Sequence, residues 1–303
     1  MILTFKEPVE PMEIRKLLFV TKFEDLCFDA LRSLLNLREA DLQHVVFMNV
    51  VERDKVAMYR GTGYRKSEEV RLKEKANIRF IDWAEDLFEE GLEVGVYLVV
   101  GRLVPQVIKA VEKEEADLLV VGRSPKGVFK QLYGGSDVTE LIRRASVPVL
   151  VFKHLTENPK DLEQPFARPL LAMDWSPASL RAVEYLTRLG KVIKQVDVAY
   201  VAGDDELTGS TGMAIQKMRK ERRRQLDEIC DQLEAAGIRA ESHVYVGDTN
   251  DEIEMAAREC QSSMIVLGSS SKSAWVERWL GSTPLSIAED SAFPTLIIPP
   301  DKG

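Results

Sequence analysis

The stretch Val266-Leu-Gly-Ser-Ser-Ser271, followed after nine residues by Gly281-Ser282-Thr283, decides the fold of this chain. Its apolar start predicts a buried strand that ends at a glycine. A loop then leads into a helix whose first turn carries small hydroxyl residues. Backbone N–H groups at such a helix start attract anions, so the arrangement is typical of a phosphate-binding turn.

The same arrangement occurs a second time upstream. Val121-Gly122-Arg-Ser-Pro125 is followed after nine residues by Gly135-Ser136, and both pairs of glycines lie 146 residues apart. Three more pairs share this offset: Gly91 and Gly237, Gly101 and Gly247, and Pro148 and Pro294. A constant offset predicts an internal repeat. From Lys22 to Asp174 the offset is 152, which places six extra residues in the first copy, around 59–66.

Length and composition agree with two domains. The chain has 303 residues, of which 45% are hydrophobic and 30% charged, enough for two domains of about 150 residues with cores of their own. Residues 154–168 contain two Xaa-Pro pairs and little apolar content, which is typical of a linker. We predict a first domain over 1–155, a linker over 156–168 and a second domain over 169–303.

The charge balance argues against a nucleic-acid partner. The net charge is −8, whereas proteins that coat nucleic acid need a basic face. The segment from Lys217 to Arg224 is basic and could suggest RNA. However, Arg223 with Asp227 and Arg224 with Glu228 have the spacing of helical ion pairs, which indicates a solvated face.

Cysteine and histidine usage predicts no metal site. Cys27, Cys230 and Cys260 lack CxxC spacing, and the three histidines form no ligand motif,. Cys230 and Cys260 fall on predicted helices and are expected to be buried. The sequence shows no paired carboxylates and no Ser-His-Asp pattern, so it nominates no catalytic residue. Without a signal-like start or an apolar run of about 20 residues, we expect a cytoplasmic protein that does not enter a membrane.

Strands and helices alternate in both halves. Expected strands are 15–21, 44–51, 93–100, 117–121 and 147–152, then 170–174 and 196–201 in the second half. Expected helices include 24–37, a long one around 76–87, 104–115, 137–144, 178–190 and 212–236. This alternation predicts an α/β fold with two tandem, doubly wound, five-stranded parallel sheets. With strand order 3-2-1-4-5, strands one and four are neighbours where ligands bind, so Asp174 lies beside Gly268 and Lys22 beside Gly122.

The second half carries the candidate nucleotide site. We expect Gly268 to turn the chain off its strand, Gly281 to let backbone amides approach a phosphate, and Asp174 to accept hydrogen bonds from an adenosine. The alternative is structural: Gly-Ser as a simple N-cap and Asp174 as a helix start. The predicted nucleotide-binding residues are Asp174, Val201, Leu267, Gly268, Ser271, Gly281, Ser282 and Thr283.

The glycine spacing after the fourth strand, with an acid after the first, resembles the signature of the universal stress protein family, and both halves carry it. This resemblance implies the adenine nucleotide alpha hydrolase-like fold, an ATP or AMP site with Mg²⁺ accompanying ATP, and domains that pair through their last strands. Both copies depart from the signature at its second glycine, which is replaced by Pro125 and by Ser271.

The first half departs further from the signature. Thr21-Lys22-Phe23 stands where Met173-Asp174-Trp175 stands in the second half, so the acid is missing. Two interpretations are open. The first half binds a small anion without adenosine, or Lys22 fills a vacated site by pairing with an acid. The residues of the weaker anion site would be Lys22, Gly122, Arg123, Gly135 and Ser136.

The resemblance implies a stress-response regulator that binds an adenine nucleotide in its second domain and acts on an unidentified protein partner. The alternatives are a nucleotide-free scaffold that works through its dimer surface and a slow ATPase. The two domains would pair within the chain, and pairing of chains into a homodimer is a further expectation.

Overall fold

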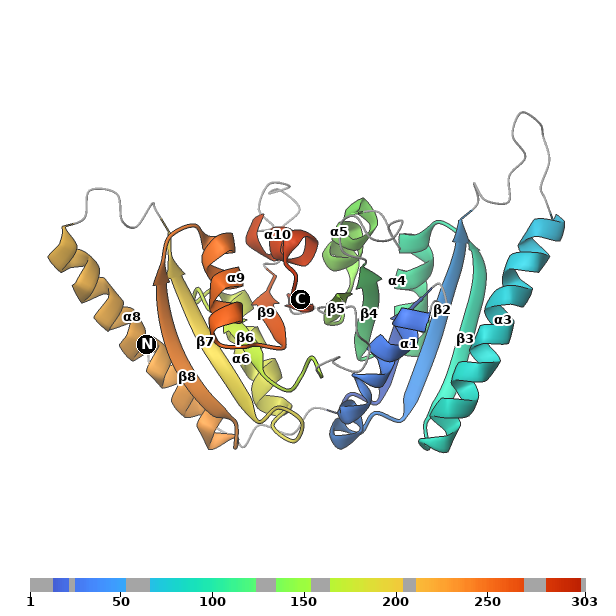
Figure 1. Cartoon of the computed structure of the whole chain (residues 1–303), viewed down its shortest axis with the longest axis horizontal. Helices are drawn as coiled ribbons and strands as arrows, with labels where there is room; N and C mark the ends of the chain where they lie inside the picture. The colour runs from blue at the N-terminus through green and yellow to red at the C-terminus, as the bar shows by residue number, and fades with distance from the viewer. Residues whose placement is uncertain are drawn as a thin grey trace, which may run out of the picture.

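The structure, a computed structural model, describes residues 13–21, 25–52, 66–123, 135–153, 164–203, 211–269 and 282–300. Its core is one ten-stranded sheet with the order β3-β2-β1-β4-β5-β10-β9-β6-β7-β8. Each half supplies five parallel strands in the order 3-2-1-4-5, so the predicted fold is confirmed. Figure 1 shows the two halves side by side, with helices on both faces of the sheet.

The elements of the first half follow the predicted alternation. Its strands are β1 (Lys16–Val20), β2 (His44–Glu52), β3 (Glu93–Gly101), β4 (Leu118–Arg123) and β5 (Val149–Lys153), and its helices are α1 (Asp25–Arg32), the 3₁₀ helix η1 (Leu35–Ala40), α3 (Lys66–Glu89), α4 (Leu103–Glu114) and α5 (Gly135–Arg144). The single helix expected over 24–37 was wrong. The α-helix ends at Arg32, where Ser33 Oγ donates to the Ala30 carbonyl, a side-chain bond that competes with helix continuation.

The second half repeats this plan. Its strands are β6 (Pro169–Ala172), β7 (Gln195–Ala202), β8 (Arg239–Val246), β9 (Met264–Gly268) and β10 (Thr295–Ile298), and its helices are α6 (Pro177–Arg188), α8 (Gly212–Ala235), α9 (Thr249–Glu259) and α10 (Ser282–Asp290). Gly91 and Gly237, which follow the long helices α3 and α8, both have positive φ angles, +78° and +83°. The predicted glycine caps are therefore confirmed.

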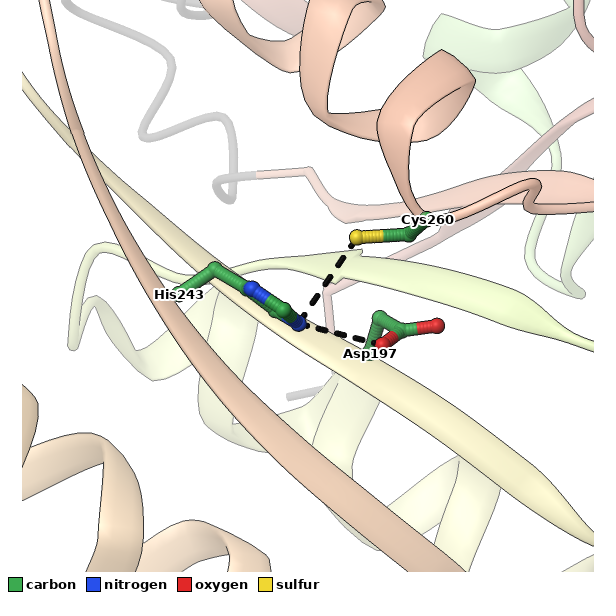
Figure 2. A group of neighbouring side chains, drawn as sticks. All are labelled: Asp197, His243 and Cys260. Carbon is green, nitrogen blue, oxygen red and sulfur yellow. Dashed lines mark hydrogen bonds and ion pairs between the residues drawn. The ribbon is translucent and has the colours of Figure 1, made fainter.

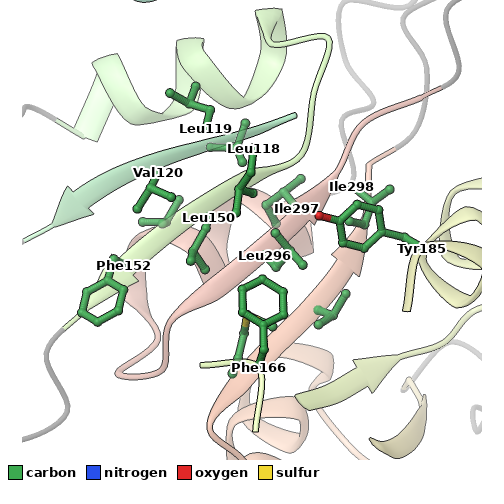
Figure 3. Close-up of a cluster of buried hydrophobic side chains, with 14 of the residues drawn as sticks. Leu118, Leu119, Val120, Leu150, Phe152, Phe166, Tyr185, Leu296, Ile297 and Ile298 are labelled. Carbon is green, nitrogen blue, oxygen red and sulfur yellow. The ribbon is translucent and has the colours of Figure 1, made fainter. Parts of the chain in front are cut away.

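The two halves join through β5 and β10, which pair antiparallel from Val149 opposite Ile297 to Val151 opposite Thr295. Figure 3 shows the apolar side chains that surround this pair, Leu150 and Leu296 among them. Lys153, at the end of β5, is buried and donates from Nζ to the carbonyls of Ile287 and Ser291, at 2.9 and 2.7 Å. The pairing through last strands that the resemblance implied is therefore present within one chain.

The last residues of the predicted linker belong to the packed structure. Phe166 has no exposed surface and belongs to the apolar cluster of Figure 3. Ser263 Oγ donates to the Pro165 carbonyl at 2.7 Å and accepts from the Arg168 N–H at 2.8 Å. This end of the linker is thus fixed to the loop before β9. Among the residues that the structure describes, no helix combines the length and apolar character of a membrane span.

Candidate functional site

A cleft lies at the carboxyl ends of β6 and β9 and holds about 510 Å³ of empty space, its open mouth included. Five of the predicted nucleotide-binding residues line it: Asp174, Val201, Leu267, Gly268 and Thr283. They come from four separate parts of the second half, and parallel strand ends bring them together. About 110 Å³ of this space can hold water, which is less than the roughly 300–1,000 Å³ of typical small-molecule sites.

Seven lining residues were not predicted as site residues, and three of them come from α9 and α10. Thr249 and Ile253 project from α9, and Pro284 belongs to the first turn of α10. No motif marks them, since α9 reaches the cleft only because the sheet is doubly wound. Ile253 and Pro284, together with Val201 and Leu267, give the cleft an apolar wall, while Asp174, Thr249 and Thr283 supply polar groups.

Asp174 holds the turn that connects β6 to α6. Its Oδ1 accepts a hydrogen bond from the Ser176 N–H at 2.9 Å. The N-cap of α6 is Ser176, whose Oγ accepts from the Ser179 N–H at 3.2 Å. Asp174 therefore has a structural role in the turn before the helix. Its side chain is nevertheless exposed, and its Oδ2 accepts no hydrogen bond from a described residue.

Trp175 follows Asp174 in a left-handed conformation, with φ of 57°. This conformation is costly for a residue with a bulky side chain. Packing offsets the cost: the indole ring lies 4.9 Å from the Tyr200 ring, and the Arg222 guanidinium lies within 4.8 and 4.9 Å of the Trp175 and Tyr200 ring centres. The three side chains hold the turn that carries Asp174.

Gly268 has a different role from the predicted one. It remains in β9 and its φ is not positive, so the expectation that it turns the chain sharply was wrong. A Cβ at this position would lie 2.1 Å from the carbonyl carbon and oxygen of Ala178. Glycine is required because β9 passes directly against the start of α6.

Arg181 of α6 fixes the chain where it leaves β9. Its Nη2 donates to the Ser269 carbonyl at 2.9 Å, and its Nε donates to the Pro299 carbonyl at 3.1 Å. The far side of the loop begins α10 with Ser282 and Thr283. The N-terminus of α10 offers backbone N–H groups at these two residues, whereas Pro284 has none. Ser271 and Gly281 lie outside the described residues.

In the first half, a side chain contacts the residue that follows β1. Asn49 of β2 donates from Nδ2 to the Thr21 carbonyl at 2.9 Å. Gly122 and Arg123 end β4, and Gly135 and Ser136 begin α5. Lys22 lies outside the described residues, so both interpretations of this half stay predictions.

The basic segment of α8 is largely exposed, as expected of a solvated face, but only one of its two predicted ion pairs forms. Arg224 pairs with Glu228 at 3.0 Å, as predicted, and also with Glu221 at 2.9 Å. The predicted pair of Arg223 with Asp227 does not form, because Asp227 Oδ1 accepts from Ser242 Oγ at 2.6 Å instead.

Comparisons with known proteins agree with this architecture. The model of the universal stress protein family matches residues 13–153 and 166–299. Universal stress protein MJ0577 of Methanocaldococcus jannaschii is 26% identical over 153 residues, which are 46% of this chain and 94% of the relative. A universal stress protein of Archaeoglobus fulgidus superimposes with a TM-score of 0.71 at 21% identity, covering 96% of this chain and 100% of its own.

A third relative is a universal stress protein solved in complex with cAMP. It is 25% identical and covers 44% of this chain and 97% of its own, and its TM-score of 0.32 is too low to transfer the position of its ligand. The family model, by contrast, matches most of the chain in two consecutive segments. This chain belongs to the universal stress protein family and contains two family domains in tandem.

Proposed function

We propose that the second domain binds an adenine nucleotide, ATP or AMP, in the cleft at the ends of β6 and β9, and that the protein is a regulator of a stress response. The observation that carries the proposal is the meeting of Asp174, Val201, Leu267, Gly268 and Thr283 around one cleft. The sequence analysis named these residues from the glycine spacing, the expected strand order and the family resemblance.

The residues have separable roles in this proposal. Asp174 accepts hydrogen bonds from the ribose through Oδ2, because Oδ1 is taken by the Ser176 N–H. Val201 and Leu267 pack against the adenine ring. Ser282 and Thr283 offer N–H and hydroxyl groups to the phosphates at the N-terminus of α10, where the helix dipole favours negative charge. Mg²⁺ accompanies ATP, and Ser271 and Gly281 complete the phosphate loop.

The nucleotide would regulate the protein by binding one of its conformations more tightly than another. A nucleotide that favours one arrangement of the segment between β9 and α10 changes which protein partner binds there. Arg181 would anchor the β9 end of this segment in either arrangement, since its Nη2 donates to the Ser269 carbonyl. Two alternatives remain in other classes: a nucleotide-free scaffold and a slow ATPase.

Ligand binding separates the binder from the scaffold. Mass spectrometry of the purified protein is expected to detect an adenine nucleotide, and calorimetry to detect ATP or AMP binding at one site. Gly281→Val should abolish binding, whereas Gly135→Val, the matched change 146 residues upstream, should leave it intact. Equal binding by both variants, or no binding by the wild type, contradicts the proposal.

Asp174 allows a finer test because its two oxygens have different roles. Asp174→Asn keeps an oxygen that can accept from the Ser176 N–H, so the turn is preserved while the charge is lost. Asp174→Ala loses both this oxygen and the charge. If Asp174→Asn lowers the affinity while its thermal stability stays that of the wild type, the carboxylate contacts the ligand. Phosphate release that requires Asp174 would favour the ATPase.

A further inference from the structure

Three side chains of metal-ligand type meet on the face of the second domain's sheet that α9 covers. Asp197 comes from β7, His243 from β8, and Cys260 directly follows α9 (Figure 2). His243 Nε2 lies 3.1 Å from Asp197 Oδ1 and 3.6 Å from Cys260 Sγ. The three ligand atoms lie within 4.8 Å of one another. Sequence spacing did not indicate this group, because its members are distant along the chain.

We propose that Asp197, His243 and Cys260 form a binding site for Zn²⁺. Tetrahedral zinc with its usual bond lengths separates a sulfur from a nitrogen ligand by about 3.6 Å and a nitrogen from an oxygen ligand by about 3.4 Å. The two distances to His243 Nε2 are close to these values. Thiolate, imidazole and carboxylate together suit zinc better than calcium or magnesium, which prefer oxygen ligands alone.

The surroundings orient the carboxylate for this role. Asp197 is 1% exposed, and its Oδ2 accepts from Arg168 Nε at 3.3 Å. Arg168 therefore holds one carboxylate oxygen and leaves Oδ1 directed at the imidazole. Metal-bound carboxylates commonly have such an outer hydrogen bond, which fixes the ligand before the metal arrives.

A metal ion can reach the site from solvent. The side chain of His243 is 28% exposed. Together with Tyr245 it lines an open groove of about 880 Å³, its mouth included. The groove carries the carboxylates of Asp227 and Glu241 and one cation, Arg223. Three protein ligands leave the fourth position of zinc to water, an arrangement that metal sites with an open position share.

The first domain provides an internal comparison. Tyr97 and Glu114 stand 146 residues before His243 and Cys260. The counterpart of Asp197 is Val46: Asp197 pairs with Leu170, and Val46 pairs with Leu18, which stands 152 residues before Leu170. The Tyr97 hydroxyl donates to Glu114. A hydrogen-bonded pair therefore satisfies this part of the fold without any metal ligand set. Only the second copy combines carboxylate, imidazole and thiol there.

The test uses the full chain after treatment with a chelator. Zn²⁺ is titrated against a chromophoric competitor, and Co²⁺ is then added as a spectroscopic probe. We expect one zinc ion per chain, a thiolate-to-cobalt charge-transfer band in the near ultraviolet, and the intense visible bands of tetrahedral cobalt. Cys260→Ser and His243→Gln should each weaken zinc binding by at least about 10-fold, and Cys260→Ser should abolish the charge-transfer band.

Cys230→Ser is the matched control. Cys230 is also a buried free thiol of the second domain, on α8 rather than in the cluster. This variant should bind zinc like the wild type and keep the cobalt spectrum. Circular dichroism identifies any ligand variant that has lost its fold. Arg168→Gln, which keeps all three ligands, is then used in place of that variant, and we expect it to lose less zinc affinity. The proposal is overturned if the wild type binds no zinc, or if Cys260→Ser and His243→Gln bind it as tightly as the wild type.

Discussion

The main chain of Gly268 passes directly against that of Ala178, so that a Cβ on residue 268 would lie 2.1 Å from the Ala178 carbonyl. The contact joins β9 to the start of α6. Both elements border the candidate cleft, since α6 follows the turn of Asp174. Gly268 is therefore needed for packing whether or not a nucleotide binds.

Gly268→Ala is expected to lower the free energy of unfolding by roughly 2–3 kcal/mol, because backbone atoms would have to move apart. Gly203→Ala is the control, since the nearest atom of the described residues to a Cβ there would be Thr249 Oγ1, at 3.8 Å. Urea denaturation measures both changes. If Gly268→Ala is as stable as Gly203→Ala, the close approach does not exist. Lost nucleotide binding by Gly268→Ala alone would not show a ligand contact.

Lys153 allows a test of the junction between the domains. Its Nζ donates to the Ile287 and Ser291 carbonyls, so Lys153→Met leaves buried acceptors without this donor. We expect a loss of roughly 2–3 kcal/mol in unfolding free energy. Lys191→Met is the control: Lys191 also joins the halves, pairing with Asp41 at 3.6 Å, but its side chain is 56% exposed. An exposed pair contributes at most about 1 kcal/mol. Equal effects of the two variants would contradict the role of Lys153.

The repeat explains why so much of the fold could be predicted. The offset between Gly122 and Gly268 and the alternation of strands and helices lead to one strand order in each half. Because parallel strand ends meet at one edge, that order also brings Asp174 to Gly268. Local patterns were sufficient here, since the hydrophobic runs and glycine turns are determined within each repeat.

Contacts between distant elements could not be predicted in the same way. Glycine is required at position 268 because of Ala178, which lies in the first turn of α6, 90 residues earlier in the chain. Asp197, His243 and Cys260 meet only after β7, β8 and α9 have packed. No spacing rule connects them, whereas the sequence motifs of metal sites describe ligands that lie close together on one element.

The two histidines of the described residues should titrate on opposite sides of the usual value of about 6.5. Hydrogen bonding to the Asp197 carboxylate, and then to Cys260, raises the pKa of His243 to about 10. Burial, and then the nearby charge of Lys16, lowers the pKa of His44. NMR of the imidazole protons in metal-free protein measures both. A titration of His243 near pH 6.5 would contradict its ion pair with Asp197.

The two histidines also change the stability of the fold with pH in opposite directions. His243 is favoured as a cation, so its contribution is complete below pH 6.5 and is lost as pH rises towards 10,. His44 is favoured as a neutral ring, so its contribution is present above pH 6.5 and is lost as pH falls below it,. Asp197→Asn should lower the pKa of His243, because the largest cause of its rise is lost while burial continues to oppose the cation,.

Two substitutions of Trp175 separate the contribution of its backbone conformation to stability from that of its side chain, at the turn that carries Asp174. Both Trp175→Ala and Trp175→Gly remove the stack with Tyr200 and Arg222, but only alanine keeps a Cβ at a φ of 57°. Glycine adopts this conformation freely, whereas alanine pays about 1 kcal/mol or more for it. We therefore expect the glycine variant to be the more stable by about 0.5–1 kcal/mol in urea denaturation, the gain being reduced by glycine's freedom in the unfolded chain. An alanine variant that is the more stable would mean that the turn abandons the left-handed conformation once the stack is lost. In that case nucleotide affinity should fall in both variants, since Asp174 would no longer be held over the cleft.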